Sequence, residues 1–254
     1  MDVSRIFDAL NDPQREAVGA PPGPMLVLAG AGSGKTRVLT YRIAYLVQAL
    51  EVSPYSILAV TFTNKAANEM RKRIEGFLGF SVRGMWIGTF HGLSHRILRD
   101  HHELAGLPKG FEILDSDDQY RVIRRALKEL NLDEGYWPPR QIQWFINSQK
   151  EEGRRATQVQ DNGDSHQQTL IRVYTHYEEN CQRLGLVDFA ELLLRTLELL
   201  EQTPSLLDAY QQRFQHILVD EFQDSNEIQY RWLKRLAEAH GQITAVGDDD
   251  QSIY

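Results

Sequence analysis

One segment near the N-terminus restricts the possible folds of this chain more than any other. The apolar run Met25–Leu28 is followed at once by a glycine-rich loop, residues 29–36, and then by a helical pattern over residues 35–48. A strand that passes through a tight glycine turn into a helix is typical of α/β proteins that bind phosphate groups. The sequence therefore predicts a buried strand at residues 25–28 and a helix that begins at Lys35.

Strand and helix patterns alternate at both ends of the chain. Further apolar runs lie at residues 57–60, 85–87, 217–219 and 242–246, with helical patterns after the first three, and a short capped helix is expected around residues 12–18. This alternation predicts an α/β fold, namely a parallel sheet with helices on both faces.

The stretch from about residue 101 to 212 has helical periodicity and hardly any strand signal. Candidate helices cover residues 116–130, 138–150, 167–184, 187–200 and 204–213. We therefore expect residues 1–100 and 213–254 to form the α/β core and residues 101–212 to form a helical insert subdomain.

The charge is distributed unevenly along the chain. The net charge is −7, which by itself argues against a nucleic-acid partner. However, residues 1–100 carry 12 Lys and Arg against 8 Asp and Glu, whereas the remaining residues carry 16 against 27. Because salt screens charges beyond roughly 8 Å, a basic track in the first part remains compatible with DNA binding.

Cysteine usage and hydropathy predict the compartment. Cys181 is the one cysteine, so no internal disulfide can form, and the chain shows neither a signal peptide nor an apolar run of twenty residues. A cytoplasmic location without membrane association fits best.

The glycine-rich loop provides groups suited to a nucleoside triphosphate. Its eight residues are Ala29, Gly30, Ala31, Gly32, Ser33, Gly34, Lys35 and Thr36. The glycines let successive backbone N–H groups face phosphate oxygens, Lys35 would reach the β- and γ-phosphates, and the Thr36 hydroxyl would bind Mg²⁺. Ala29 replaces the usual first glycine. The alternative, a flexible connector with a solvated lysine, does not explain the placement between strand and helix.

A pair of acids follows the apolar run at residues 217–219. In open α/β sheets ligands bind beyond the carboxyl ends of the strands, where Asp220 and Glu221 are expected. Asp220 would bind Mg²⁺, and Glu221 would orient or deprotonate the attacking water. Such acids are often only part of a solvated loop, but the phosphate loop makes the catalytic interpretation the favoured one.

Together these segments resemble the UvrD, Rep and PcrA helicases of superfamily 1. Residues 220–224 resemble motif II, 10–14 the Q-motif, 29–37 motif I, 61–67 motif Ia, 88–92 motif Ib and 246–254 motif III. In the insert, residues 147–150 and 186–193 resemble the bacterial UvrD-type members. The resemblance covers residues 10–254 and implies a RecA-like P-loop NTPase core.

The resemblance implies further roles at the nucleotide site. Gln14 would contact the adenine, and Arg37 would lie near the base. Gln251 would sense the γ-phosphate and act in catalysis with Lys35 and Glu221.

Motifs Ia and Ib imply contacts with DNA. The residues concerned are Phe62, Thr63, Asn64, Thr89, Phe90 and His91. Phe62 and Phe90 end predicted strands, where an aromatic ring can stack on a base without reading its identity. The nearby basic residues, which could neutralise phosphates, are Lys65, Arg71, Lys72, Arg73, Arg96 and Arg99. Burial in the core is the alternative for each aromatic ring and for His91.

The resemblance also implies an activity: an ATP-dependent 3′ to 5′ DNA helicase motor that uses Mg²⁺, binds single-stranded and partly duplex DNA, and acts with repair proteins in nucleotide excision and mismatch repair. Family members complete the ATP site with arginine fingers from a second RecA-like domain. That domain is expected to be absent here, so this chain would bind ATP but hydrolyse it poorly. The alternatives are a non-catalytic module that binds nucleotide and single-stranded DNA, or the motor part of a helicase–nuclease.

Overall fold

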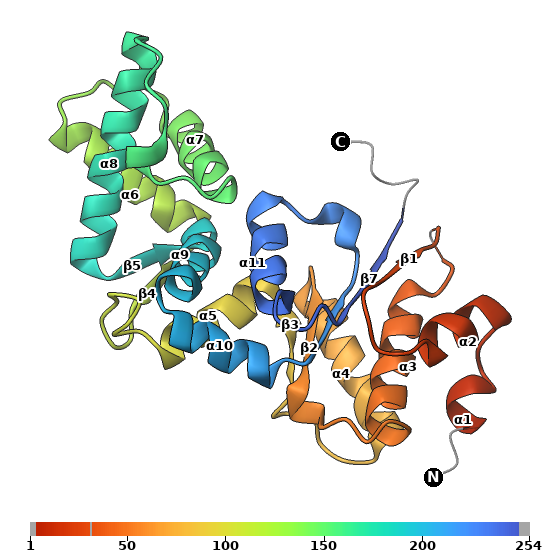
Figure 1. The fold of residues 1–254 in the computed structure, drawn as a ribbon. Helices are drawn as coiled ribbons and strands as arrows, with labels where there is room; N and C mark the ends of the chain where they lie inside the picture. Colours follow the sequence, from red (N-terminus) through yellow and green to blue (C-terminus); the bar gives the residue numbers. More distant parts are fainter. Residues whose placement is uncertain (1–3, 31, 249–254) are drawn as a thin grey trace. The chain divides into compact units, whose positions relative to one another are not determined.

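The computed structural model describes residues 4–30 and 32–248, which divide into two compact units (Figure 1). The α/β unit comprises the described parts of Met1–Leu93, Thr203–Ser225 and Leu233–Tyr254. The helical unit comprises Ser94–Gln202 and Asn226–Trp232. The domain boundaries expected from the sequence, which enclose a helical insert at residues 101–212, remain a prediction.

The α/β unit is built on a five-stranded parallel sheet, as the alternation of patterns predicted. In spatial order the strands are β1 (Met25–Leu28), β7 (Ile243–Gly247), β6 (His216–Val219), β2 (Ile57–Thr61) and β3 (Trp86–Thr89). Strands that lie in the middle of such a sheet are buried on both faces, and every residue of β2 is buried.

Helices cover both faces of this sheet. Those of the α/β unit are α1 (Ser4–Phe7), α2 (Asp12–Gly19), α3 (Lys35–Gln48), α4 (Asn64–Leu78) and α10 (Pro204–Arg213). Side chains of α3 and α4, including Leu39 and Met70, form a buried cluster with alternate sheet residues such as Ala59. On the opposite face Trp86 of β3 packs edge-on against Phe214, with ring centroids 5.1 Å apart.

Strand β1 differs from the prediction of a buried strand. It lies at one edge of the sheet, and Leu26 and Leu28 are 57% and 56% exposed. An apolar run does not distinguish a central strand from an edge strand, because its alternate residues can be covered on one face alone.

The helical unit contains α6 (Ser116–Glu129), α7 (Pro139–Glu151), α8 (Ser165–Leu184) and α9 (Phe189–Gln202). α5 (Phe90–Asp100) and α11 (Glu227–Ala237) each contribute residues to both units. Two strands of this unit were not predicted from the sequence, namely β4 (Glu112–Leu114) and β5 (Leu186–Asp188). They pair with each other in parallel. With three residues each, they are too short to produce a recognisable period. Within the described ranges, no helix is both long and apolar enough to span a membrane.

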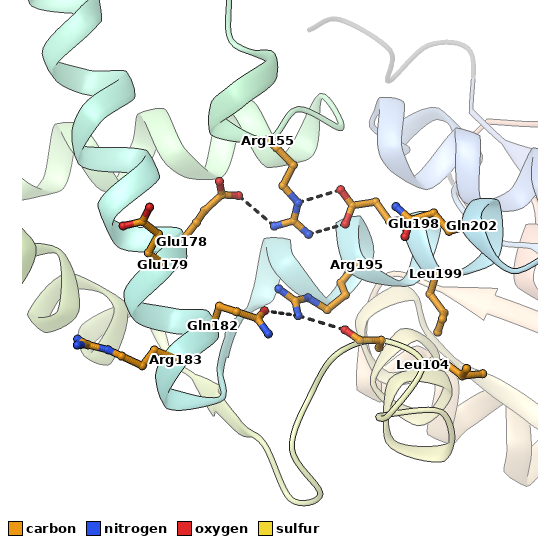
Figure 2. Close-up of a pocket in the computed structure, with 11 residues that line it drawn as sticks. Leu104, Arg155, Glu178, Glu179, Gln182, Arg183, Arg195, Glu198, Leu199 and Gln202 are labelled. Carbon is orange, nitrogen blue, oxygen red and sulfur yellow. Dashed lines mark hydrogen bonds and ion pairs between the residues drawn. The ribbon is translucent and has the colours of Figure 1, made fainter.

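A buried ion cluster holds the helices of this unit together. The Nζ atom of Lys150 lies 2.6 Å from Asp188 Oδ2 and 2.9 Å from Glu191 Oε2, and all three side chains are almost completely buried. Arg155 lies 2.7 Å from Glu191 and, as Figure 2 shows, between Glu178 and Glu198. Removing one partner from such a cluster would leave an uncompensated buried charge.

The pKa of Glu191 reflects this environment. Burial alone would raise the pKa of the carboxyl group, but Lys150, Arg155 and Arg195 hold it below its ordinary value. Glu191 is therefore ionised at neutral pH, and its charge is compensated by three cations.

We predict that Lys150→Met destabilises the helical unit by about 3–5 kcal/mol, because Asp188 and Glu191 lose a shared buried cation. Urea unfolding followed by far-UV circular dichroism measures the change, and hydrogen exchange assigns it to residues 139–202. Arg121→Met is the matched control, since its ion pair with Asp118 is exposed and should contribute less than about 1 kcal/mol. Equal effects of the two substitutions would contradict this account.

Candidate active site

The site forms where the five parallel strands end. Leu28 pairs with Gly247, Val60 with Val219, and Thr61 with Thr89. Because the strands are parallel, the residues that follow them meet at one edge of the sheet. These residues include Ala29, Phe62, Phe90, Asp220 and Asp248.

The glycine-rich loop makes the turn that its sequence predicted. Gly32 and Gly34 have φ angles of 77° and 87°, which favour glycine, and the Ser33 N–H donates to the Gly30 carbonyl at 3.2 Å. Gly34 precedes α3 and provides no side-chain cap. The first N–H groups of α3 therefore remain available to an anion, and the helix dipole favours one there.

Lys35 is buried at the centre of this edge, with only 8% of its surface exposed. Its Nζ atom donates to the Ala29 carbonyl at 3.1 Å and to Asp248 Oδ2 at 3.2 Å, and lies 3.9 Å from Glu221 Oε2. An ammonium group held in this position faces two carboxylates and the phosphate loop. It can exchange these partners for phosphate oxygens of a bound nucleotide.

Thr36 and Asp220 have the geometry of two neighbouring ligands of Mg²⁺. The Thr36 hydroxyl donates to Asp220 Oδ2 at 2.9 Å. In an octahedral Mg²⁺ site with ligands at roughly 2.1 Å, adjacent oxygens lie about 2.9 Å apart. In the described part of the chain, no three His, Cys, Asp or Glu side chains form a metal-binding group. A metal here would therefore take its other ligands from water and phosphate, as Mg²⁺ commonly does.

Asp220 is 2% exposed, and burial raises the pKa of its carboxyl group above the ordinary value despite the hydrogen bond from Thr36. Nearby Glu221 raises this pKa further, while Lys35 acts in the opposite direction. A divalent cation beside Asp220 would stabilise its ionised form. The site is thus electrostatically suited to a cation.

Glu221 occupies a left-handed backbone conformation, with φ 49° and ψ 46°. Gln223 fixes its side chain: the Gln223 amide donates to Glu221 Oε2 at 2.8 Å, while its oxygen accepts from the Asp248 N–H at 3.0 Å. The same carboxylate oxygen lies 3.9 Å from Lys35 Nζ. Left-handed conformations of residues other than glycine concentrate at functional sites.

Gln14 and Arg37 lie beside the phosphate loop. Gln14 is the third residue of α2, where it completes a capping box with Asn11, and its amide also donates to the Ser33 carbonyl at 2.9 Å. Arg37 donates to the Ala9 carbonyl at 2.5 Å and lies over the ring of Tyr41. Both side chains are therefore held next to the site, and their predicted contacts with a base remain predictions.

The predicted DNA-binding residues lie at the ends of β2 and β3. Phe62 is partly exposed, and its ring meets Phe90 edge-on with centroids 5.4 Å apart. Phe90, however, is only 1% exposed, so neither face of its ring is open to a base in this structure. Its buried ring packs against Phe62 and so limits the positions of that side chain. The first residue of α5 thus points into the core, and the contact of Phe90 with DNA remains a prediction.

The other residues of this predicted track differ in exposure. Thr63 and Asn64 are exposed, and the Thr63 hydroxyl caps α4 by accepting from the Ala66 N–H at 3.1 Å. Thr89 is buried and accepts from the Gly92 N–H at 3.1 Å. His91 is partly buried, and burial lowers its pKa. Their contacts with DNA remain predictions.

Two residues of the site had no role assigned from the sequence, namely Asp248 and Gln223. Asp248 directly follows β7, so the rule that singled out Asp220 could also have found it. Gln223 had no comparable signal, because its role depends on the turn after β6. The predicted residues Ala31 and Gln251 lie outside the described residues.

We predict that Glu221→Gly raises the free energy of unfolding relative to Glu221→Ala by about 1 kcal/mol, because glycine adopts φ 49° without strain. Both substitutions remove the same carboxylate, so their difference isolates the backbone. Thermal unfolding of the two variants measures it, and equal midpoints would contradict a strained backbone at this position.

Comparisons with known proteins identify the family of the chain. A family model described as "UvrD/REP helicase N-terminal domain" matches residues 10–254. The chain is 60% identical over its whole length to DNA helicase II of Escherichia coli, and 44% identical over 99% of its length to the ATP-dependent DNA helicase PcrA of Bacillus subtilis. It spans 35% and 34% of those two proteins, respectively.

Proposed function

The chain belongs to the UvrD/REP helicase N-terminal domain family, and on this premise we propose that it is the ATP-binding part of a DNA helicase motor. Its parallel sheet with flanking helices is the α/β, RecA-like core of that family. The proposed ligands are MgATP and single-stranded DNA. The observation that carries the proposal is the meeting of Lys35, Thr36, Asp220 and Glu221 at one edge of the sheet.

Each of these side chains has a distinct role in the proposed reaction. Lys35 leaves Asp248 and binds the β- and γ-phosphates, while Thr36 and Asp220 hold Mg²⁺. Bound Mg²⁺ would neutralise charge that develops on the phosphate oxygens. Glu221, oriented by Gln223, accepts a proton from the attacking water. Gln251 is proposed to sense the γ-phosphate.

The activity of a whole helicase is a wider proposal, since the chain spans about a third of the relatives it matches. From the family resemblance we propose 3′ to 5′ movement, action in nucleotide excision and mismatch repair in the cytoplasm, and cooperation with repair proteins. The same resemblance places arginine fingers in a second RecA-like domain. Because such a finger contributes roughly 10³–10⁵ in rate, we propose that rapid hydrolysis at this site depends on that domain.

We predict that Lys35→Ala lowers the affinity for ATP in the presence of Mg²⁺ by at least about tenfold, because a charge-assisted contact of about 1.5–3 kcal/mol with the phosphates is lost. Fluorescence of an N-methylanthraniloyl ATP derivative measures binding. Lys128→Ala, which removes an exposed lysine of α6, is the control and should bind normally. Unchanged affinity in a folded Lys35→Ala variant would refute the phosphate-loop assignment.

A second substitution distinguishes a contribution of Thr36 through the metal from a direct contact of Thr36 with the phosphates. Thr36→Val preserves shape but removes the hydroxyl that lies beside Asp220. It should weaken nucleotide binding in Mg²⁺ and leave binding in EDTA unchanged. An equal loss in both conditions would show that Thr36 does not act through a metal.

The DNA contact is proposed to centre on Phe62, which combines partial exposure with support from Phe90. Stacking on one ring requires a base but not a particular base. The exposed Lys65 and Lys72 are close in sequence and could bind phosphates. Arg71 is less suited, since it donates to the Ile87 carbonyl, and burial lowers its pKa.

We predict that Phe62→Ala weakens binding of single-stranded oligonucleotides by about 1–3 kcal/mol, equally for dT, dA and dC homopolymers. Fluorescence anisotropy measures the affinities. Phe80→Ala, which removes another exposed phenylalanine of the α/β unit, should leave them unchanged. A loss restricted to one base would contradict stacking as the mode of contact.

A further inference from the structure

The ammonium group of Lys35 interacts with three carboxylates, and the proposed reaction uses only two of them. Asp220 is proposed to hold Mg²⁺ and Glu221 to accept a proton, whereas Asp248 has no role in that reaction. Lys35 Nζ nevertheless lies closer to Asp248 Oδ2, at 3.2 Å, than to Glu221 Oε2, at 3.9 Å. The carboxylate without a role in the reaction is therefore the nearer of these two partners.

Burial strengthens the effect of Asp248 on Lys35. The side chains of Asp248 and Lys35 are 2% and 7% exposed, whereas the side chain of Glu221 is 38% exposed. Water and salt screen the charge of a partly exposed group, but they screen little of the interaction between two buried groups. Most of the electrostatic attraction between Lys35 and these two carboxylates therefore comes from Asp248.

The backbone at the end of β7 fixes the position of Asp248. The Asp248 N–H donates to Gln223 Oε1 at 3.0 Å, and the carbonyl of the preceding Gly247 accepts from the Ala29 N–H at 3.0 Å. A Cβ atom on Gly247 would lie 2.9 Å from Gln223 Oε1, so a larger residue there would displace the Gln223 amide. The contact between Asp248 and Lys35 is therefore determined by the strand end and not by a flexible side chain alone.

Nucleotide binding changes the partners of Lys35. In the proposed function the ammonium group contacts the β- and γ-phosphates, and its contact with Asp248 is lost. Breaking this ion pair is unfavourable, because a buried carboxylate loses the cation that compensates its charge. Part of the free energy gained from the phosphate contact is therefore offset by the lost contact with Asp248.

We propose that Asp248 is an autoinhibitory group of the ATP site, which competes with the phosphates for Lys35 and so weakens nucleotide binding. This inference rests on the proposed function and concerns the regulation of the same site. Asp248 takes Lys35 back when the nucleotide leaves, so its carboxylate also favours release. A group can shift an equilibrium only through a difference in its interactions between the two states, and the Lys35–Asp248 contact provides that difference.

Asp248→Asn tests the proposal, since the amide keeps the size of the side chain and the backbone N–H but removes the charge. We expect the variant to bind the N-methylanthraniloyl ATP derivative in Mg²⁺ at least about fivefold more tightly than wild type, mainly through slower release. Stopped-flow fluorescence measures both rates. Asp208→Asn, which removes an exposed carboxylate of α10, is the matched control for net charge and should bind as wild type does.

A purely structural role of Asp248 predicts the opposite change. If its carboxylate served to position Lys35 for the nucleotide, Asp248→Asn would bind ATP more weakly than wild type. Weaker binding or an unchanged affinity would therefore overturn the proposal. Asp248→Ser removes the same charge with less bulk, so it replaces Asp248→Asn if circular dichroism shows that the latter does not fold, and it should shift the affinity in the same direction.

The Lys35→Ala background separates competition for the lysine from direct repulsion of the phosphates. Competition requires Lys35, so Asp248→Asn should change the affinity of the Lys35→Ala variant by less than about twofold. A gain of full size in that background would overturn the proposed competition. Failure of the proposed function has a different signature, because wild type, Lys35→Ala and Asp248→Asn would then bind ATP equally or not at all, and the autoinhibitory role would be refuted with it.

Discussion

The buried contact between Lys35 and Asp248 joins residues 213 positions apart in the chain, and the rest of the site depends on it. It holds the phosphate loop after β1 against the end of β7. A buried ammonium group without a partner would be unstable, so the carboxylate that follows β7 holds Lys35 in place. In the proposed function, a phosphate group of ATP takes over this contact. The neighbouring contact between Thr36 and Asp220 joins the loop to β6 in a similar way. The glycine-rich loop, the proposed Mg²⁺ ligands Thr36 and Asp220, and the candidate base Glu221 therefore form one assembly.

The helical unit uses buried charge for a different purpose. Lys150 and Asp188 belong to two short segments, 147–150 and 186–193, whose resemblance to UvrD-type helicases stood out in the sequence without suggesting a role. The structure brings these segments together: Lys150 binds Asp188, Asn147 accepts from Gln119, and Gln119 donates to Asp188. Because each group is satisfied only in one arrangement, such a cluster favours a unique packing of α6, α7 and α9.

The sheet edge of the α/β unit carries two groups in unfavourable environments. At the sheet edge, a left-handed glutamate and a desolvated aspartate keep reactive groups ready for a ligand. Such groups reduce stability locally and are tolerated because packing around them is dense.

The sequence by itself determined the α/β class, the parallel sheet, the glycine turn between β1 and α3, and the acids after β6. These features depend on local patterns: apolar runs, glycine spacing and residues at strand ends. Tertiary structure alone decided that β1 is an edge strand, that Phe90 is buried while Phe62 remains partly exposed, and that Gln223 orients Glu221. It also decided the pairing of β4 with β5 and the meeting of Lys150 with Asp188. Burial and pairing depend on which distant segments pack together, and no local pattern contains that information.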